Sequence, residues 1–218
     1  MMSQLKNYPL NPTTFPEDAY NTLEEGSIES AIFCRQTWEK SIPFIYSFRN
    51  AVDIGCRDGE YTRHLQNVFN HVFCFDPRKR PLFSGNVIKE KVTHFTCALG
   101  NTKNKYPRVG NNAMKEKYIP DPHSLPTLDS FDFKNIDYIK IDTDGYEYDI
   151  IQGGLNTIQK YRPLIVCETD RADCCTDLQK SKRFNQYHAI DFLVNELNYI
   201  EVDEMNNDIV LIATENKK

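Results

Sequence analysis

The segment AVDIGCRDGEYTRHLQNVF, residues 51–69, indicates the architecture of this chain more clearly than any other. It starts as a short apolar run, turns through Gly55 and Gly59, and continues with apolar residues at helical spacing. The residues at that spacing are Tyr61, Leu65 and Phe69. An apolar run, a glycine turn and a helical period in succession predict a strand, a tight turn and a helix.

The same alternation of apolar runs and amphipathic segments continues toward the C-terminus. Further strands are predicted at residues 71–75, 93–99, 136–142 and 163–168, with helices through 150–158 and 187–197. Two last runs, 199–202 and 208–213, flank Met-Asn-Asn and predict a hairpin. This pattern predicts an α/β fold with a mostly parallel sheet that is closed by an antiparallel C-terminal hairpin.

The composition is that of one folded domain preceded by an arm. Of the 218 residues, 40% are apolar and 12% aromatic, so the chain can bury a core without metals or disulfides. Residues 1–26 contain three prolines and predict an extended arm, followed by a helix that begins at Ile28 and ends near Lys40. We assign residues 1–50 to an N-terminal arm and helix that could act as a lid, and residues 51–218 to the main domain.

Charge is distributed unevenly along the chain. There are 26 Lys and Arg against 31 Asp and Glu, a net charge of −5. The stretch from Arg78 to Lys117 nevertheless holds ten cations and only two acids, a net charge of +8. These cations either form a solvated face or attract an anionic acceptor, such as a nucleotide-linked sugar, a phosphorylated glycan or RNA.

The seven cysteines do not indicate a disulfide framework or a zinc site, because their number is odd and no C-x-x-C pair occurs. The N-terminus has no apolar signal core, and the longest apolar run, Ile209 to Ala213, is too short to span a bilayer. We expect a cytoplasmic protein without a membrane partner, and we assign no metal ligands.

Ligands of parallel α/β sheets bind beyond the carboxyl ends of the strands, so these ends supply the candidate cofactor residues. The candidates are Asp53, Gly55, Cys56, Gly59, Asp76, Ala98 and Asp142. Asp53 precedes the glycine turn and suits a ligand with a cationic amine. Asp76 follows 23 residues later, where a carboxylate can accept hydrogen bonds from ribose hydroxyls.

The glycine turn is not a dinucleotide fingerprint. In the pattern G-x-G-x-x-G, Arg57 and Glu60 would occupy the second and third glycine positions, so NAD is disfavoured. S-adenosylmethionine has an amine, a ribose and an adenine but no phosphate, and it fits the acidic residues and the turn.

Six segments resemble, in order, the FkbM family of S-adenosylmethionine-dependent methyltransferases. They are VDIGCRDGEYT, FCFDPR, CALGN, PTLDSF, YIKIDTDGYEYDIIQGG and PLIVCE, all within residues 51–213. The stretch from Lys140 to Glu147 is the most specific, because it is similar to the family's KIDVEGAE. The resemblance implies a Rossmann-like class I methyltransferase that methylates oxygen, commonly on sugars or other hydroxylated small molecules.

Methyl transfer to an alcohol needs a base at the reacting oxygen, and strand ends supply the catalytic candidates Asp142, Lys140 and Glu168. With a period of two residues, Lys140 and Asp142 share one face of their strand. A buried lysine must find a carboxylate, so this pair either braces the sheet or holds Asp142 or the acceptor oxygen at the methyl group. Glu168 is a second candidate for the base, a hydrogen-bond acceptor for a hydroxyl of the substrate, or a helix cap.

The predicted function is therefore methylation of a hydroxyl, with a hydroxylated small molecule or a glycan as the acceptor. An RNA ribose 2′-O-methyltransferase is an alternative that shares the fold, and its binding would fall steeply with added salt. A non-catalytic S-adenosylmethionine-binding protein is another, and it would bind the cofactor without turnover. The sequence does not predict an oligomeric state.

Overall fold

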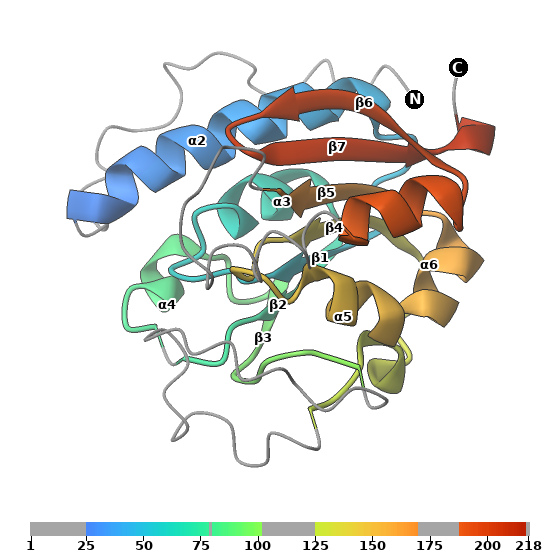
Figure 1. The fold of residues 1–218 in the computed structure, drawn as a ribbon. Helices are drawn as coiled ribbons and strands as arrows, with labels where there is room; N and C mark the ends of the chain where they lie inside the picture. Colours follow the sequence, from blue (N-terminus) through green and yellow to red (C-terminus); the bar gives the residue numbers. More distant parts are fainter. Residues whose placement is uncertain (1–24, 79, 102–124, 170–187, 217–218) are drawn as a thin grey trace, which may run out of the picture.

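The computed structural model of the protein describes residues 25–78, 80–101, 125–169 and 188–216. Within these residues, seven strands form one sheet in the order β3-β2-β1-β4-β5-β7-β6 (Figure 1). The strands are β1 (Asn50–Ile54), β2 (His71–Phe75), β3 (Val92–Phe95), β4 (Ile136–Ile141), β5 (Leu164–Glu168), β6 (Tyr199–Met205) and β7 (Asp208–Ala213).

The strands β1 to β5 pair in parallel, and the C-terminal hairpin closes the sheet. β7 pairs antiparallel with both β5 and β6. Asn206 and Asn207 turn the hairpin with φ of +54° and +68°, in the left-handed region that asparagine tolerates. The predicted α/β fold, with a mostly parallel sheet and an antiparallel C-terminal hairpin, is confirmed.

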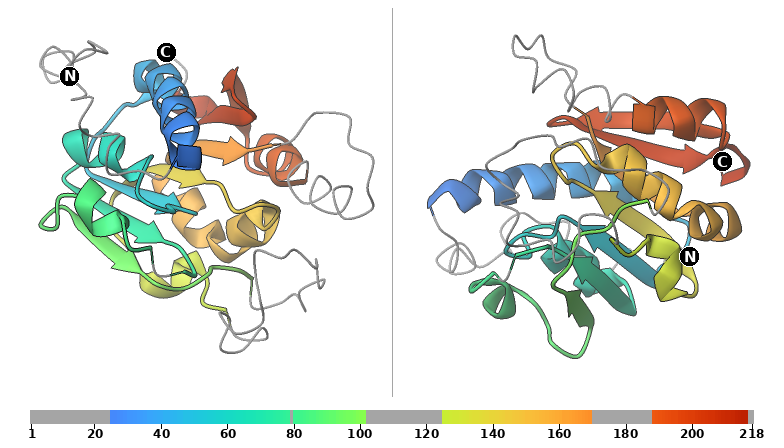
Figure 2. Two further views of the ribbon diagram at one scale, coloured as in Figure 1. Left: turned by 90° about the vertical axis from the view of Figure 1, so that its left-hand side faces the viewer. Right: turned by 60° about the horizontal axis from the view of Figure 1, so that its bottom comes forward.

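Helices cover both faces of the sheet (Figure 2, left). One face carries α2 (Glu25–Ser41), α3 (Thr62–Val68) and α4 (Phe83–Asn86), and the other carries α5 (Glu147–Gly153), α6 (Leu155–Tyr161) and a helix over 188–195. Each layer has its own hydrophobic cluster against the sheet. Burial on both faces explains why β5 is almost entirely apolar and why the charged residues of β1 and β4 are buried as well.

The helix α2 shares the cluster on its face of the sheet. Trp38 is 1% exposed, and its ring lies 6.5 Å from that of Tyr61 and 5.8 Å from that of Tyr138. The helix lies along the C-terminal hairpin (Figure 1), where the Thr37 hydroxyl donates to the carbonyl of Met205 at 3.4 Å. The predicted arm before residue 25 lies outside the described residues, and the domain boundary at residue 51 stays a prediction.

Two predicted elements differ in detail. β3 ends at Phe95, four residues before the predicted end, so that Ala98 belongs to the segment that follows the strand. The helix predicted through 150–158 is two helices, α5 and α6, which meet at Gly154. Gly153, just before this junction, leaves room for the segment after β3. A Cβ at Gly153 would lie 2.1 Å from the carbonyl oxygen of Gly100.

The cysteines of the described residues are free, and Cys56, Cys74 and Cys167 are buried in the manner of small hydrophobic residues. Cys174 and Cys175 lie outside the described residues. In the part of the chain that the structure describes, every helix is too short or too polar to cross a membrane.

Candidate active site

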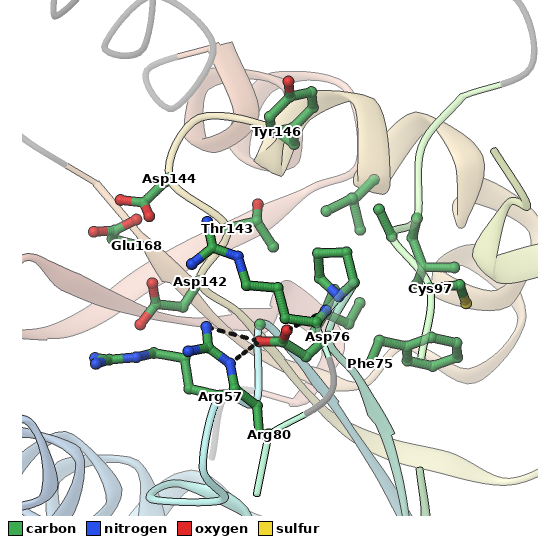
Figure 3. Close-up of a pocket in the computed structure, with 17 residues that line it drawn as sticks. Arg57, Phe75, Asp76, Arg80, Cys97, Asp142, Thr143, Asp144, Tyr146 and Glu168 are labelled. Atoms are coloured by element: carbon green, nitrogen blue, oxygen red, sulfur yellow. Dashed lines mark hydrogen bonds and ion pairs between the residues drawn. The ribbon is translucent and has the colours of Figure 1, made fainter. Parts of the chain in front are cut away.

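A cavity of about 480 Å³ lies at the carboxyl ends of the parallel strands (Figure 3). Its wall is formed by the segments that follow β1, β2, β3 and β4, together with Glu168 at the end of β5. The strand order reverses direction at β1, which lies between β2 and β4. Parallel sheets bind ligands at this point, so the cavity lies where the sequence predicts a ligand.

Gly55 brings the ends of β1 and β4 together beside the cavity. Its φ is +89°, and its N–H donates to the carbonyl of Phe75 at 2.8 Å. A Cβ at this position would lie 1.7 Å from the carbonyl oxygen of Asp142. Any side chain at residue 55 would therefore push away the loop that carries Asp142.

Asp76 presents a fixed carboxylate at one end of the cavity. The residue is 3% exposed, and its Oδ1 accepts the backbone N–H of Arg78 at 2.7 Å. The guanidinium of Arg80 lies 3.5 Å from Oδ2 (Figure 3). With Phe75 and Ala98 also in the wall, this end can hold a ribose through its hydroxyls and a flat ring through apolar contacts.

Three carboxylates line the other side of the cavity. Figure 3 shows Asp142, Asp144 and Glu168 together, on the side away from Phe75. The side chain of Asp142 is 43% exposed, so its carboxylate is open to a ligand. This side offers several hydrogen-bond acceptors to a hydroxylated molecule.

Arg57 adds a positive charge to the cavity wall. It stands in the glycine turn with φ of +44°, and its Nη1 donates to the hydroxyl of Ser30 in α2 at 3.2 Å. The sequence pattern at residue 57 only excludes a dinucleotide fingerprint. Its place in the cavity follows from the left-handed backbone of the turn, which no local signal predicts.

Glu147 organises the loop between Asp142 and α5. Its Oε1 accepts the backbone N–H groups of Thr143 and Gly145 at 3.0 and 3.2 Å, and the hydroxyl of Thr143 at 3.0 Å. Burial raises the pKa of Glu147, and these donors oppose the shift. Glu147 therefore fixes the loop that carries Asp144.

Lys140 meets two carboxylates, as a buried lysine must. Its Nζ lies 3.3 Å from Oδ2 of Asp142 and 2.6 Å from Oδ1 of Asp208, which begins β7. Burial lowers the pKa of Lys140, but the charges of Asp142 and Asp208 outweigh it and hold that pKa above its ordinary value. The sequence predicts the first partner from strand periodicity. The second depends on where β7 enters the sheet.

Asp53, Cys56 and Gly59 are not part of the cavity wall. The Asp53 carboxylate is 1% exposed and accepts the hydroxyl of Thr62 in α3 at 2.5 Å. Burial raises the pKa of Asp53 to about 7, against the lowering effect of that hydrogen bond. The predicted contacts of these three residues with a cofactor stay predictions, whereas Gly55, Asp76, Ala98, Asp142 and Glu168 do line the cavity.

The basic stretch is described only in part. Arg78 and Arg80 line the cavity beside Asp76, whereas the cations from Lys103 to Lys117 lie outside the described residues. Among the residues that the structure describes, no group of three or more His, Cys, Asp and Glu side chains is placed to hold a metal ion.

Comparison with known proteins shows the same fold, and part of the chain matches one family. Residues 115–201 match the family described as the methyltransferase FkbM domain. The crystal structure of methyltransferase FkbM from Methylobacillus flagellatus KT is 16% identical, with a TM-score of 0.51 over 75% of this chain and 43% of that chain. A proposed caffeoyl-CoA O-methyltransferase from Staphylococcus aureus is 11% identical, with a TM-score of 0.54 over 84% of this chain and 83% of that chain.

These comparisons confirm the resemblance that the sequence segments carry. The fold is the Rossmann-like fold of class I methyltransferases. This chain covers 43% of the length of the M. flagellatus structure. No curated protein sequence matches it.

Proposed function

We propose that this FkbM-type, S-adenosylmethionine-dependent methyltransferase transfers the methyl group of its cofactor to a hydroxyl of a sugar or glycan acceptor. The observation that carries the proposal is the exposed carboxylate of Asp142 in the cavity, held by the buried Lys140. A carboxylate that a buried ammonium holds in place and that is open to a ligand has the geometry of a general base.

The cavity fits the cofactor. In this proposal Asp76 accepts the ribose hydroxyls, and Phe75 and Ala98 contact the adenine. The turn at Gly55 leaves room for the methionine part of the cofactor. The bound cofactor supplies a methyl group on a sulfonium, which is already a good leaving group. The chain therefore has to align the acceptor and remove its proton.

Asp142 takes the proton of the acceptor hydroxyl in this proposal. Asp144 and Glu168 accept hydrogen bonds from neighbouring hydroxyls and orient the ring, and Glu168 is the second candidate for the base. A sugar offers several hydroxyl donors on one rigid ring, which matches a wall with three carboxylates. Arg57 on the same cavity provides a place for an anionic substituent.

The cofactor assignment is tested by calorimetric titration of the protein with S-adenosylhomocysteine. We expect binding by the wild type and at least a tenfold weaker Kd for Asp76→Ala, because the ribose hydroxyls lose a charged acceptor. Asp191→Ala is the matched control, since that exposed acid accepts the amide of Asn195 in its own helix at 2.7 Å and does not line the cavity. Equal binding by Asp76→Ala and wild type would contradict the assignment.

The acceptor is identified by a screen with labelled methyl donor against neutral oligosaccharides, nucleotide sugars and capped RNA. We expect transfer to a sugar hydroxyl, and a loss of about 10²- to 10⁴-fold in kcat for Asp142→Asn with little change in cofactor Kd. Transfer to RNA alone, with binding that falls steeply as salt is added, would favour the ribose 2′-O-methyltransferase. Cofactor binding without transfer to any acceptor would favour a non-catalytic protein.

A further inference from the structure

The ammonium of Lys140 is shared between two carboxylates of different exposure. The side chains of Lys140, Asp208 and Asp142 are 2%, 11% and 43% exposed. The Nζ atom lies closer to Asp208, at 2.6 Å, than to Asp142, at 3.3 Å. The ring of Tyr61 lies 5.5 Å from the same nitrogen. The cation is therefore buried, and of these three neighbours Asp142 is the one that lines the cavity.

Asp208 reaches this position from the strand beyond β5. It begins β7, where it stands in register with Glu168 of β5 and Met205 of β6. Lys140 stands in register with Val166 of β5, so its side chain extends across β5 toward the carboxyl ends. The position of Asp208 in the hairpin therefore places its carboxylate beside the Lys140 ammonium.

We propose that Asp208 is a positioning residue for methyl transfer, which holds the Lys140 ammonium so that Asp142 keeps both its orientation and its strength as a base. This role rests on the proposed function, in which Asp142 removes the acceptor proton. It adds a residue that touches neither cofactor nor acceptor, and that comes from the C-terminal hairpin.

The physical reason is a competition for one cation. An ammonium that faced Asp142 alone would stabilise its charged form, and the carboxylate would then bind a proton weakly. Asp208 shares the ammonium at the shorter distance, so removing its charge would leave more of the ammonium's attraction to Asp142. Two carboxylates and one ammonium leave a net charge of −1, and the exposed member is the one that can take up a proton from a ligand.

Other titratable groups also face this cluster. Around Lys140 they are Cys34 of α2, Asp53 of β1, Tyr138 of β4, and Glu60 and Tyr61 before α3. On the cavity side of Asp142 they are Arg57, Asp76, Arg78, Arg80, Cys97, Asp144, Tyr146 and Glu168. A substitution at Asp208 keeps all of these side chains, although the charge of Asp208 also acts on Cys34, Tyr61 and Tyr138.

The test is the pH dependence of kcat for wild type and Asp208→Asn, at saturating cofactor and acceptor. Asparagine keeps the shape and the acceptor oxygen but removes the charge. We expect the acidic limb of the profile to move to lower pH by about one unit. We expect the plateau to fall roughly tenfold, because a weaker base removes the proton more slowly. The Kd for S-adenosylhomocysteine should stay within about twofold of wild type.

Asp203→Asn is the matched control. Asp203 lies on the same hairpin and pairs with Lys40 at 3.5 Å, but it does not contact Lys140. It should leave the profile in place. Asp208→Ser removes the same charge with a smaller side chain, and it gives the same shift should Asp208→Asn not fold.

The outcomes separate this role from the proposed function. Turnover by wild type with coincident profiles for the Asp208 variants, even at a lower melting temperature, would show that Asp208 only braces the sheet. A fall in kcat without movement of the acidic limb would also show a merely structural role. No transfer by wild type to any acceptor would overturn the proposed function, and the role of Asp208 with it.

Discussion

At the scale of single residues, Gly55 is the position where a side chain is least tolerable. The carbonyl oxygen of Asp142 lies where its Cβ would be, and its φ of +89° is strained for any other residue. This contact couples the glycine turn after β1 to the loop that carries the proposed base.

We therefore expect Gly55→Ala to destabilise the fold by about 3 kcal/mol or more and to weaken binding of S-adenosylhomocysteine. Gly85→Ala is the control, because a Cβ there has no heavy atom within 4 Å. It should be neutral or stabilise α4 by up to about 1 kcal/mol. Urea unfolding and calorimetric titration measure both effects, and equal stability of the two variants would refute the argument.

Asp53 gives the second prediction at this scale, which concerns pH. Its pKa is about 7 in the folded protein, against 3.8 for an ordinary aspartate, because the carboxyl is buried. The folded state therefore holds this proton more tightly than the unfolded chain does. Stability is lost as pH rises from about 4 through 7, by roughly 4 kcal/mol in all, and is then constant.

Asp53→Asn removes this contribution and should gain stability relative to wild type as pH rises from 5 to 8. Urea unfolding of the two proteins at several pH values measures the difference. Parallel curves for the variant and the wild type would mean that the pKa of Asp53 is the same in the folded and the unfolded state.

At the scale of elements, Trp38 is the largest side chain that α2 buries against the sheet. Trp38 is buried against Tyr61 and Tyr138, while Phe33 on the same helix is 50% exposed. We expect Trp38→Ala to cost about 3–5 kcal/mol and Phe33→Ala no more than about 0.5 kcal/mol.

Because Trp38 is the only tryptophan, its fluorescence also reports on α2 directly. Its emission should be poorly quenched by acrylamide, and should change at the same denaturant concentration as the far-ultraviolet circular dichroism of the whole protein. An earlier fluorescence transition would show instead that α2 detaches before the sheet unfolds, as a lid would.

At the scale of the whole molecule, charge of both signs meets in one cavity. The overall charge of −5 does not describe this site, which has carboxylates on one side and Arg57 in the same wall. An acceptor with both hydroxyls and an anionic group would use both kinds of side chain.

For such an acceptor, we expect Arg57→Gln to raise KM by about 10- to 100-fold, which corresponds to the loss of a charged hydrogen bond. A neutral sugar should be affected little. Lys134→Gln is the control. Lys134 precedes β4, at the amino ends of the parallel strands and therefore opposite the cavity, and it pairs with Asp132. Equal losses for neutral and anionic acceptors would show that Arg57 only supports the turn.

Much of the fold and part of the site are predictable because they depend on local patterns. Strand and helix periods locate six of the seven strands to within three residues at each end, and β3 is predicted too long only because its apolar run continues past Phe95. The placement of Asp76 and Asp142 at strand ends follows from the same periods. The role of Arg57 is not predictable in this way, because its entry into the cavity requires a left-handed turn.

Three features depend on residues a few positions apart, so they can be predicted from the sequence alone. They are the alternation of strands and helices, the strand ends at which ligands bind, and the pairing of Lys140 with Asp142. The contact of Asp53 with α3, and the sharing of Lys140 with Asp208, 68 residues away, require the folded molecule. The latter contact exists because β7 enters the sheet beside β5, and which strand lies at that place is set by packing of the whole sheet.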